Sequence, residues 1–141
     1  MSRLAALVPL LALIAANPAS ASVDVEISGL RNAKGLLHVC ITRNPAFFLD
    51  CRKDPKGFRQ TAPANERLLH FDGLPPGRYA VTLVHDENSN EKLDTMLGIP
   101  REGFGFSRNP AIRFGAPKFD EVSINLAPAA NRAAIRMKYL I

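Results

Sequence analysis

The sequence predicts an all-β fold, a single antiparallel β-sandwich of about six to seven strands with two long loops. Apolar and polar residues alternate with a period of two in six separate segments, as in strands that bury one face. No segment sustains a helical period beyond a turn or two near residues 45–49. Several short strands without long helices are typical of a sandwich.

The first three strands are expected at residues 23–28, 37–42 and 66–72. In the first two, valine, leucine and isoleucine occupy every second position, so one face of each strand should be buried. Residues 29–35 begin and end with glycine and supply the turn between them. In the third strand, the adjacent Leu68 and Leu69 blur the distinction between the two faces.

The fourth strand is expected at residues 79–84, where both faces are apolar enough to be at least partly covered. The last two strands are expected at residues 121–126 and 135–139, again with an apolar residue at every second position. The two long connections, 43–65 and 88–118, exceed the usual length of loops in compact domains, so we expect them to be functional or packed down.

Residues 1–21 have the pattern of a cleaved signal peptide. Arg3 precedes an apolar run at 4–16, and Ala19-Ser20-Ala21 matches the small-residue cleavage site. The run is shorter than the roughly 20 apolar residues that span a bilayer. The sequence therefore predicts an exported, periplasmic or extracellular protein. Its residues 22–141 would form one β-sandwich domain without a transmembrane segment. The alternative interpretation of the run is a buried N-terminal helix.

Charge and cysteine content narrow the classes of function. The formal net charge of +5 is modest, and no Lys/Arg block with interleaved aromatic residues supports nucleic-acid binding. Cys40 and Cys51 are the two cysteines, and export favours a disulfide between them. Two free thiols or a redox pair are the alternative, although ten intervening residues do not make a C-x-x-C motif.

An oxygen-rich loop follows the fourth strand and predicts a calcium site. Side chains at loop positions 1, 3, 5 and 9 and the carbonyl at position 7 are the usual calcium ligands of such loops. Here those positions are Asp86, Asn88, Asn90, Asp94 and, for the carbonyl, Lys92. Position 6 is Glu91 instead of glycine and position 12 is Leu97 instead of glutamate, and both favour the metal-free alternative. A bound calcium ion would have the weak affinity of extracellular sites, of order 10⁻⁴–10⁻³ M. The alternative is a metal-free turn in which Asp and Asn side chains bind their own backbone amides.

Two stretches carry a family resemblance. FDGLPPGRYAV at residues 71–81 is similar to a step in transthyretin-like sandwich domains. HDENSNEKLD at 85–94, followed by GIPREGFGFS at 98–107, resembles the bacterial domain-of-unknown-function family 2141. The resemblance implies export and a transthyretin-like or immunoglobulin-like sandwich, and it implies no established activity. In that family glycine is usual at the positions of Ser89 and Glu91.

The sequence predicts a non-catalytic module, not an enzyme. His85 beside Asp86, with Ser107 downstream, does not make a catalytic set, because no nucleophile elbow surrounds Ser107. We expect a working surface at the end of the sandwich that binds an envelope protein or an anionic surface polymer. Its candidate residues are His85, Arg101, Phe104, Phe106 and Arg108.

The alternative function is a small-molecule carrier or hydrolase. Phe104, Phe106 and Phe114 are spaced along the second long loop, and large aromatic side chains need a place to bury their rings. They either pack the loop down as a cover or line a ligand pocket beneath it.

Overall fold

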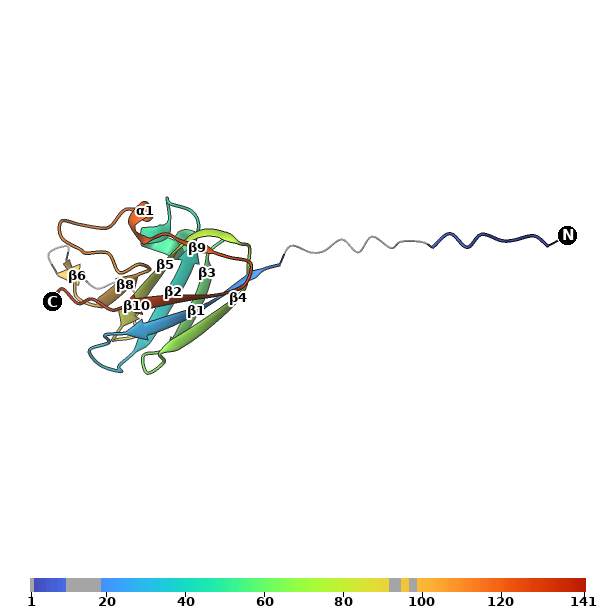
Figure 1. Cartoon of the computed structure of the whole chain (residues 1–141). Coiled ribbons are helices and arrows are strands. Elements are labelled where there is room, and N and C mark those ends of the chain that lie inside the picture. Colours follow the sequence, from blue (N-terminus) through green and yellow to red (C-terminus); the bar gives the residue numbers. More distant parts are fainter. Residues whose placement is uncertain (1, 10–18, 92–94, 97–98) are drawn as a thin grey trace.

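The computed structural model describes residues 2–9, 19–91, 95–96 and 99–141, and in this part of the chain the all-β sandwich is confirmed (Figure 1). One sheet has the strand order β10-β1-β4, and the second has the order β3-β2-β5-β8, with β9 also paired to β5. The first sheet consists of β1 (Ala21–Ser28), β4 (Leu68–Leu74) and β10 (Ala130–Arg136). The second consists of β2 (Leu36–Thr42), β3 (Phe58–Pro63), β5 (Gly77–Asp86), β8 (Gly103–Phe106) and β9 (Ile124–Leu126).

Short elements complete the fold. The two-residue strands β6 (Thr95–Met96) and β7 (Ile99–Pro100) pair with each other. A 3-10 helix, η1 (Phe48–Lys53), and a single helical turn, α1 (Phe119–Val122), lie in the two long connections. Within the described residues no helix is both long and apolar enough to cross a membrane.

Among the described strands, every pair but one is antiparallel. β1 and β10 run parallel, with Val25 opposite Ala133, whereas β1 and β4 run antiparallel. A parallel pair needs a long connection. β1 and β10 lie near opposite ends of the chain, so the rest of the domain serves as that connection.

The core lies between the two sheets and follows the predicted alternation. The inward residues of β1, β2 and β5 are almost fully buried. These residues are Val23, Val25, Ile27, Leu37, Val39, Ile41, Tyr79, Val81 and Leu83. A second, smaller apolar cluster of Phe48, Ala80 and Val122 lies apart from this core, and Phe106 and Phe119 pack against it. The expectation that both faces of the fourth strand are covered is therefore correct.

Four local predictions need correction. The loop predicted at 43–65 contains β3, which pairs with β2 from Leu36 to Ile41. The loop predicted at 88–118 contains β8, paired with the end of β5. The strand predicted at 121–126 begins as the helical turn α1 because Glu121 accepts a hydrogen bond from the Lys118 amide. The last strand spans Ala130–Arg136 instead of 135–139, because its pairing with β1 begins earlier.

The start of the sandwich coincides with the predicted cleavage site. Ala21 is the first residue of β1, is 1% exposed and pairs with Leu74. Residues 2–9 form no regular structure, and Leu4, Leu7 and Val8 are exposed to solvent. The signal peptide itself stays a prediction.

Candidate functional site

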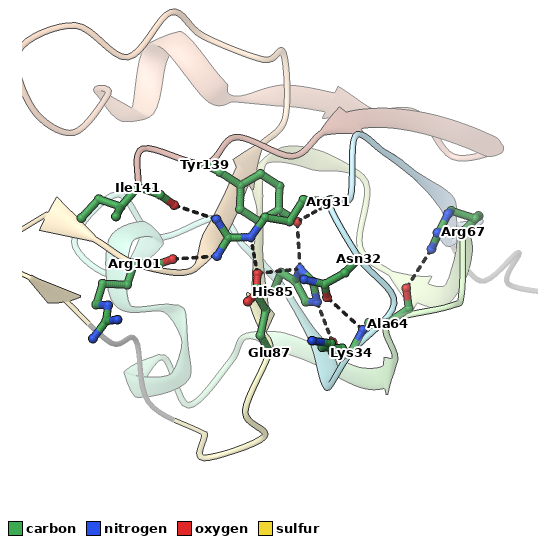
Figure 2. A network of polar contacts seen from close by, with 10 residues as sticks. All are labelled: Arg31, Asn32, Lys34, Ala64, Arg67, His85, Glu87, Arg101, Tyr139 and Ile141. Carbon is green, nitrogen blue, oxygen red and sulfur yellow. Dashed lines mark hydrogen bonds and ion pairs between the residues drawn. The ribbon is translucent and has the colours of Figure 1, made fainter.

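His85 sits at the end of β5 and is fully buried in a polar network (Figure 2). Its Nε2 lies 2.6 Å from the carbonyl oxygen of Lys34, which can only accept, so Nε2 carries the hydrogen. Its Nδ1 lies 2.8 Å from the hydroxyl of Tyr139, and the hydroxyl oxygen accepts the amide of Arg31. Both ring nitrogens therefore have protein partners, and His85 holds three chain segments together.

Arg31 extends this network to the C-terminal residues. Its Nε donates to Oε1 of Glu87 at 2.5 Å, and its other nitrogens donate to the carbonyl oxygens of Ile141 and Arg101 (Figure 2). The guanidinium carbon lies 4.5 Å from the centroid of the Tyr139 ring, in cation–π contact. The hydrogen bond from Arg31 lowers the pKa of Glu87 and outweighs the opposing effect of its burial. Glu87 is therefore an anchor for Arg31.

Asp86 is also fully buried and orders the loop that follows it. Its Oδ2 accepts the amide of Glu91 at 2.8 Å and Nε2 of His38 at 2.9 Å, and its Oδ1 accepts the amide of Asn90 at 3.2 Å. Burial alone raises the pKa of Asp86, but the hydrogen bonds from His38, Glu91 and Asn90 outweigh it and lower the pKa.

In the loop that follows β5, residues 86–91 form hydrogen bonds of the kind expected for the metal-free turn, the alternative to a calcium site. Asp86 and Asn88 both accept backbone amides of the loop itself. Of the predicted calcium ligands, Lys92 and Asp94 lie outside the described residues. Elsewhere in the described chain, no group of three or more His, Cys, Asp or Glu side chains is arranged to hold a metal. Calcium binding stays a prediction.

Ser89 and Glu91 adopt left-handed backbone conformations, with φ of 55° and 59°. These are the two positions where the family resemblance implies glycine, which reaches this conformation without steric cost. Replacing Glu91 by glycine is expected to raise the free energy of unfolding by about 0.5–1 kcal/mol, because it relieves this cost. Urea unfolding checks the change. Glu66→Gly, at a position without a positive φ, is the control and should be destabilising.

Ser107 and His85 do not form a nucleophile–base pair. Ser107 is buried, donates its hydroxyl hydrogen to the Val122 carbonyl and accepts the amide of Val81 at 3.0 Å. Strand pairing places His85 opposite Gly103 and places Ser107 level with Val81. Four residues along a strand separate the two side chains by roughly 13 Å. Ser107 is therefore a structural residue.

An open groove of about 860 Å³ lies on the outer face of the second sheet; we call it the outer groove. Phe104 and Phe106 line it, as the pocket alternative expects, whereas Phe114 is fully exposed and does not. His85 is buried, and Arg108 donates to the carbonyl of Asp120, so neither belongs to the lining. Arg101 also lies outside it. The predicted surface is thus split, and only its two phenylalanines meet at one site.

Several lining residues were missed by sequence reasoning. Cys40 of β2 and Thr82 and Val84 of β5 point outward into the groove, and Arg113 and Leu140 border it. The sequence could have indicated Cys40, Thr82 and Val84, because the outward face of a strand that faces water usually carries more polar residues than these. The disulfide between Cys40 and Cys51 is confirmed, with Cα atoms 6.0 Å apart, and both cysteines line the groove.

Acidification is expected to destabilise the domain. The pKa is lowered in Asp54 by a hydrogen bond from Thr42, in Glu87 by Arg31, and in Asp86 by its three donors against the effect of burial. Such carboxyl groups contribute stability that is fully present above their unfolded pKa values, ordinarily 3.8 for Asp and 4.5 for Glu. This contribution is lost as the pH falls through the lower folded values.

Urea unfolding between about pH 3 and pH 5.5 checks this dependence. The midpoint should be level near the upper end of the range and should fall steadily toward the lower end. A midpoint that is constant or rises on acidification would contradict the assignment.

The fold and the site define a small β-sandwich domain with two features: a hydrogen-bonded polar motif, His85-Asp86-Glu87, at the end of β5, and an open, largely apolar groove on the outer face of the second sheet. Residues 25–134 match the family described as "Uncharacterized protein conserved in bacteria (DUF2141)", and the chain belongs to this family. No curated protein matches the chain.

A solved structure of a pilus-presented adhesin (Cpa) is similar at 13% sequence identity with a TM-score of 0.39. The match covers 86% of this chain and 27% of that chain, so this chain spans about a quarter of the adhesin's length. At this TM-score the likeness carries no argument about function.

Proposed function

We propose that the chain is an exported, non-catalytic β-sandwich module of the bacterial cell envelope, with the outer groove as its working surface. One observation carries the proposal. The residues best suited to chemistry, His85, Asp86, Glu87 and Ser107, are bound to other side chains or to the backbone, and the first two and Ser107 are fully buried. The open surface nearby is apolar instead of reactive.

Two further features support export. The sequence of residues 1–21 has the order of a signal peptide, and β1 begins at Ala21, the last residue of this segment. The Cys40–Cys51 disulfide is of the kind that persists in oxidising compartments such as the bacterial periplasm.

Cell fractionation and intact mass of the full chain, tagged at its C-terminus and expressed in a bacterial host, test this proposal. The expected product is found in the periplasm or medium, lacks residues 1–21 and has no thiol that reacts with a maleimide. A variant without residues 2–21 is the control and should stay in the cytoplasm. An uncleaved wild-type chain in the cytoplasm with two reactive thiols would overturn the proposal.

A weak calcium site in the loop that begins at Asp86 is the second component of the proposal. Its support is the alternating set of oxygen-bearing side chains. A calcium concentration ten times the dissociation constant should stabilise the native state by about 1.4 kcal/mol. Thermal unfolding in millimolar calcium should therefore give a higher midpoint than unfolding in chelator, and Asp94→Ala should remove the difference. An unchanged wild-type midpoint would contradict calcium binding.

A carrier of small molecules is the second candidate function, and the outer groove specifically favours it. The groove has the volume of a ligand site, roughly 300–1,000 Å³. Neither His85 nor Ser107 lines it, so this pair supplies no hydrolase site in the groove.

A further inference from the structure

We infer that the outer groove binds a single-chain amphiphile with an anionic head group, of the chemical class of fatty-acid carboxylates. This inference rests on the proposed function, because it names the ligand of the groove that serves as the working surface.

The floor of the groove is an apolar strip across three neighbouring strands. Outward side chains of β2, β5 and β8 contribute the apolar Cys40, Val84, Phe104 and Phe106, and the hydroxyl-bearing Thr82 lies between Cys40 and Phe106. The rings of Phe104 and Phe106 pack edge to face, with centroids 6.1 Å apart. Phe104, Phe106 and Val84 are only partly buried, so the protein leaves apolar floor accessible instead of covering it.

The walls continue this apolar surface above the floor. Leu49 of η1 is 58% exposed and Leu140 near the C-terminus is 50% exposed, and both border the groove. Ile112 and Pro117 border it from the connection between β8 and α1. The edge-to-face contacts of Phe48 with Phe106 and Phe119 belong to the second apolar cluster, which fills the space beside the groove. An apolar chain is the ligand that gains most from such walls.

The charge on the covering segments selects an anion. Residues 107–118 carry Arg108, Arg113 and Lys118 and no acidic residue. Arg113 lines the groove, is exposed and donates no hydrogen bond within the described part of the chain. Arg113 is therefore available to a carboxylate.

Among the described lining residues, the remaining charges leave a small basic excess. Asp50 lines it but lies 3.0 Å from the ammonium group of Lys53. Arg52 donates to the backbone carbonyl of Glu91, and this contact leaves the positive charge of Arg52 unneutralised. Glu91 also lines the groove, and its negative charge offsets one of the two positive charges of Arg52 and Arg113. The excess is small, so the head group should add modestly to an affinity that comes mainly from the chain.

His38 connects the groove to the polar motif. It lines the groove, and its ring bridges Oδ2 of Asp86 and the hydroxyl of Thr61. The buried carboxylate thereby fixes a polar side chain at the edge of the apolar floor. This arrangement gives the motif a role in shaping the groove without contact with the ligand.

Isothermal titration calorimetry and amide chemical shifts test the inference, with the protein as purified and three probes, the two ionic ones below their micelle concentrations and the alcohol below its solubility limit. The probes are dodecanoate, dodecanol and dodecyltrimethylammonium, which share a chain and differ in charge. We expect dodecanoate to bind most tightly, dodecanol less tightly and the cation least, with shift changes centred on the groove. Arg113→Gln should weaken dodecanoate binding by roughly fivefold and leave dodecanol binding unchanged. The control Arg136→Gln, on β10, should change neither.

A second variant tests the chain site. Val84→Trp fills the floor with an apolar side chain and should weaken both dodecanoate and dodecanol by more than about tenfold. Leu68→Trp on β4, away from the groove, is its control. The inference would be overturned if none of the three probes bound, or if the chemical-shift changes lay outside the groove. It would also be overturned if the protein formed a dimer that occupies the groove. Equal binding of dodecanoate and dodecanol, or no effect of Arg113→Gln, would overturn the anionic head group. The fractionation experiment is independent, so the envelope-module proposal stands or falls separately.

Discussion

Replacing Asp86 by alanine is expected to lower the free energy of unfolding by about 3 kcal/mol. The buried carboxylate accepts hydrogen bonds from the ring of His38 and from the amides of Asn90 and Glu91. A buried donor that loses its acceptor costs about 1–3 kcal/mol, and the exposed loop lets some donors turn to water. Urea unfolding followed by circular dichroism measures the loss.

Two matched variants separate this role from the loss of a negative charge. Asp72→Ala removes an exposed carboxylate that pairs with His70 on the surface, and it should cost less than about 0.5 kcal/mol. Asp86→Asn keeps an acceptor oxygen and should fall between the two alanine variants. A cost for Asp86→Ala no larger than that for Asp72→Ala would show that the carboxylate does not organise the loop.

The core strands could be predicted from the sequence because burial of one face imposes a period of two. β1, β2 and β5 carry that period, since each packs a complete apolar face into the core. β3 was missed because its alternation is weak. Its polar residues Arg59, Gln60 and Thr61 follow one another, and pairing with β2 makes it a strand.

β8 was assigned to a loop because its sequence is Gly-Phe-Gly-Phe. A Cβ atom on Gly103 would lie 2.4 Å from Cε1 of Tyr139, and one on Gly105 would lie 2.5 Å from Cγ2 of Ile135. Glycine therefore faces inward because other segments pack directly on the strand backbone. The phenylalanines face outward and form the floor of the groove. The two glycines of this segment led to the prediction of a loop. The two phenylalanines form part of the candidate binding surface.

The polar motif could be located from the sequence, but its role could not. His85, Asp86 and Glu87 are adjacent, whereas their partners come from segments about 50 residues away in the chain. Lys34, His38 and Arg31 have no spacing pattern that links them to the motif. Only the pairing of β2 with β5 brings the groups together. The sequence therefore could not show that His85, Asp86 and Glu87 hydrogen-bond to these distant segments.

Replacing both Cys40 and Cys51 by alanine is expected to lower the free energy of unfolding by about 2–3 kcal/mol. The disulfide closes a short loop with a sequence separation of 11, and opening it increases the conformational freedom of the unfolded chain. Both cysteines are buried, so alanine is preferred to serine, which would bring a hydroxyl group into an apolar site. Typical stabilities of about 5–15 kcal/mol leave such a variant folded.

Reductant provides the control. It should lower the unfolding midpoint of the wild-type protein to that of the double variant and leave the double variant unchanged. A reductant effect on the double variant, or a wild-type loss below about 1 kcal/mol, would contradict the assignment.

The same variant separates the stability of the sandwich from the shape of the groove. The disulfide ties η1, which supplies the wall residue Leu49, to β2, which supplies part of the floor. Its removal frees this wall while the core between the sheets keeps its residues. We therefore expect dodecanoate affinity to fall severalfold under conditions where the double variant remains fully folded. Unchanged affinity would mean that the wall is held by other contacts, such as the buried hydrogen bond from Thr42 to Asp54 at the end of η1.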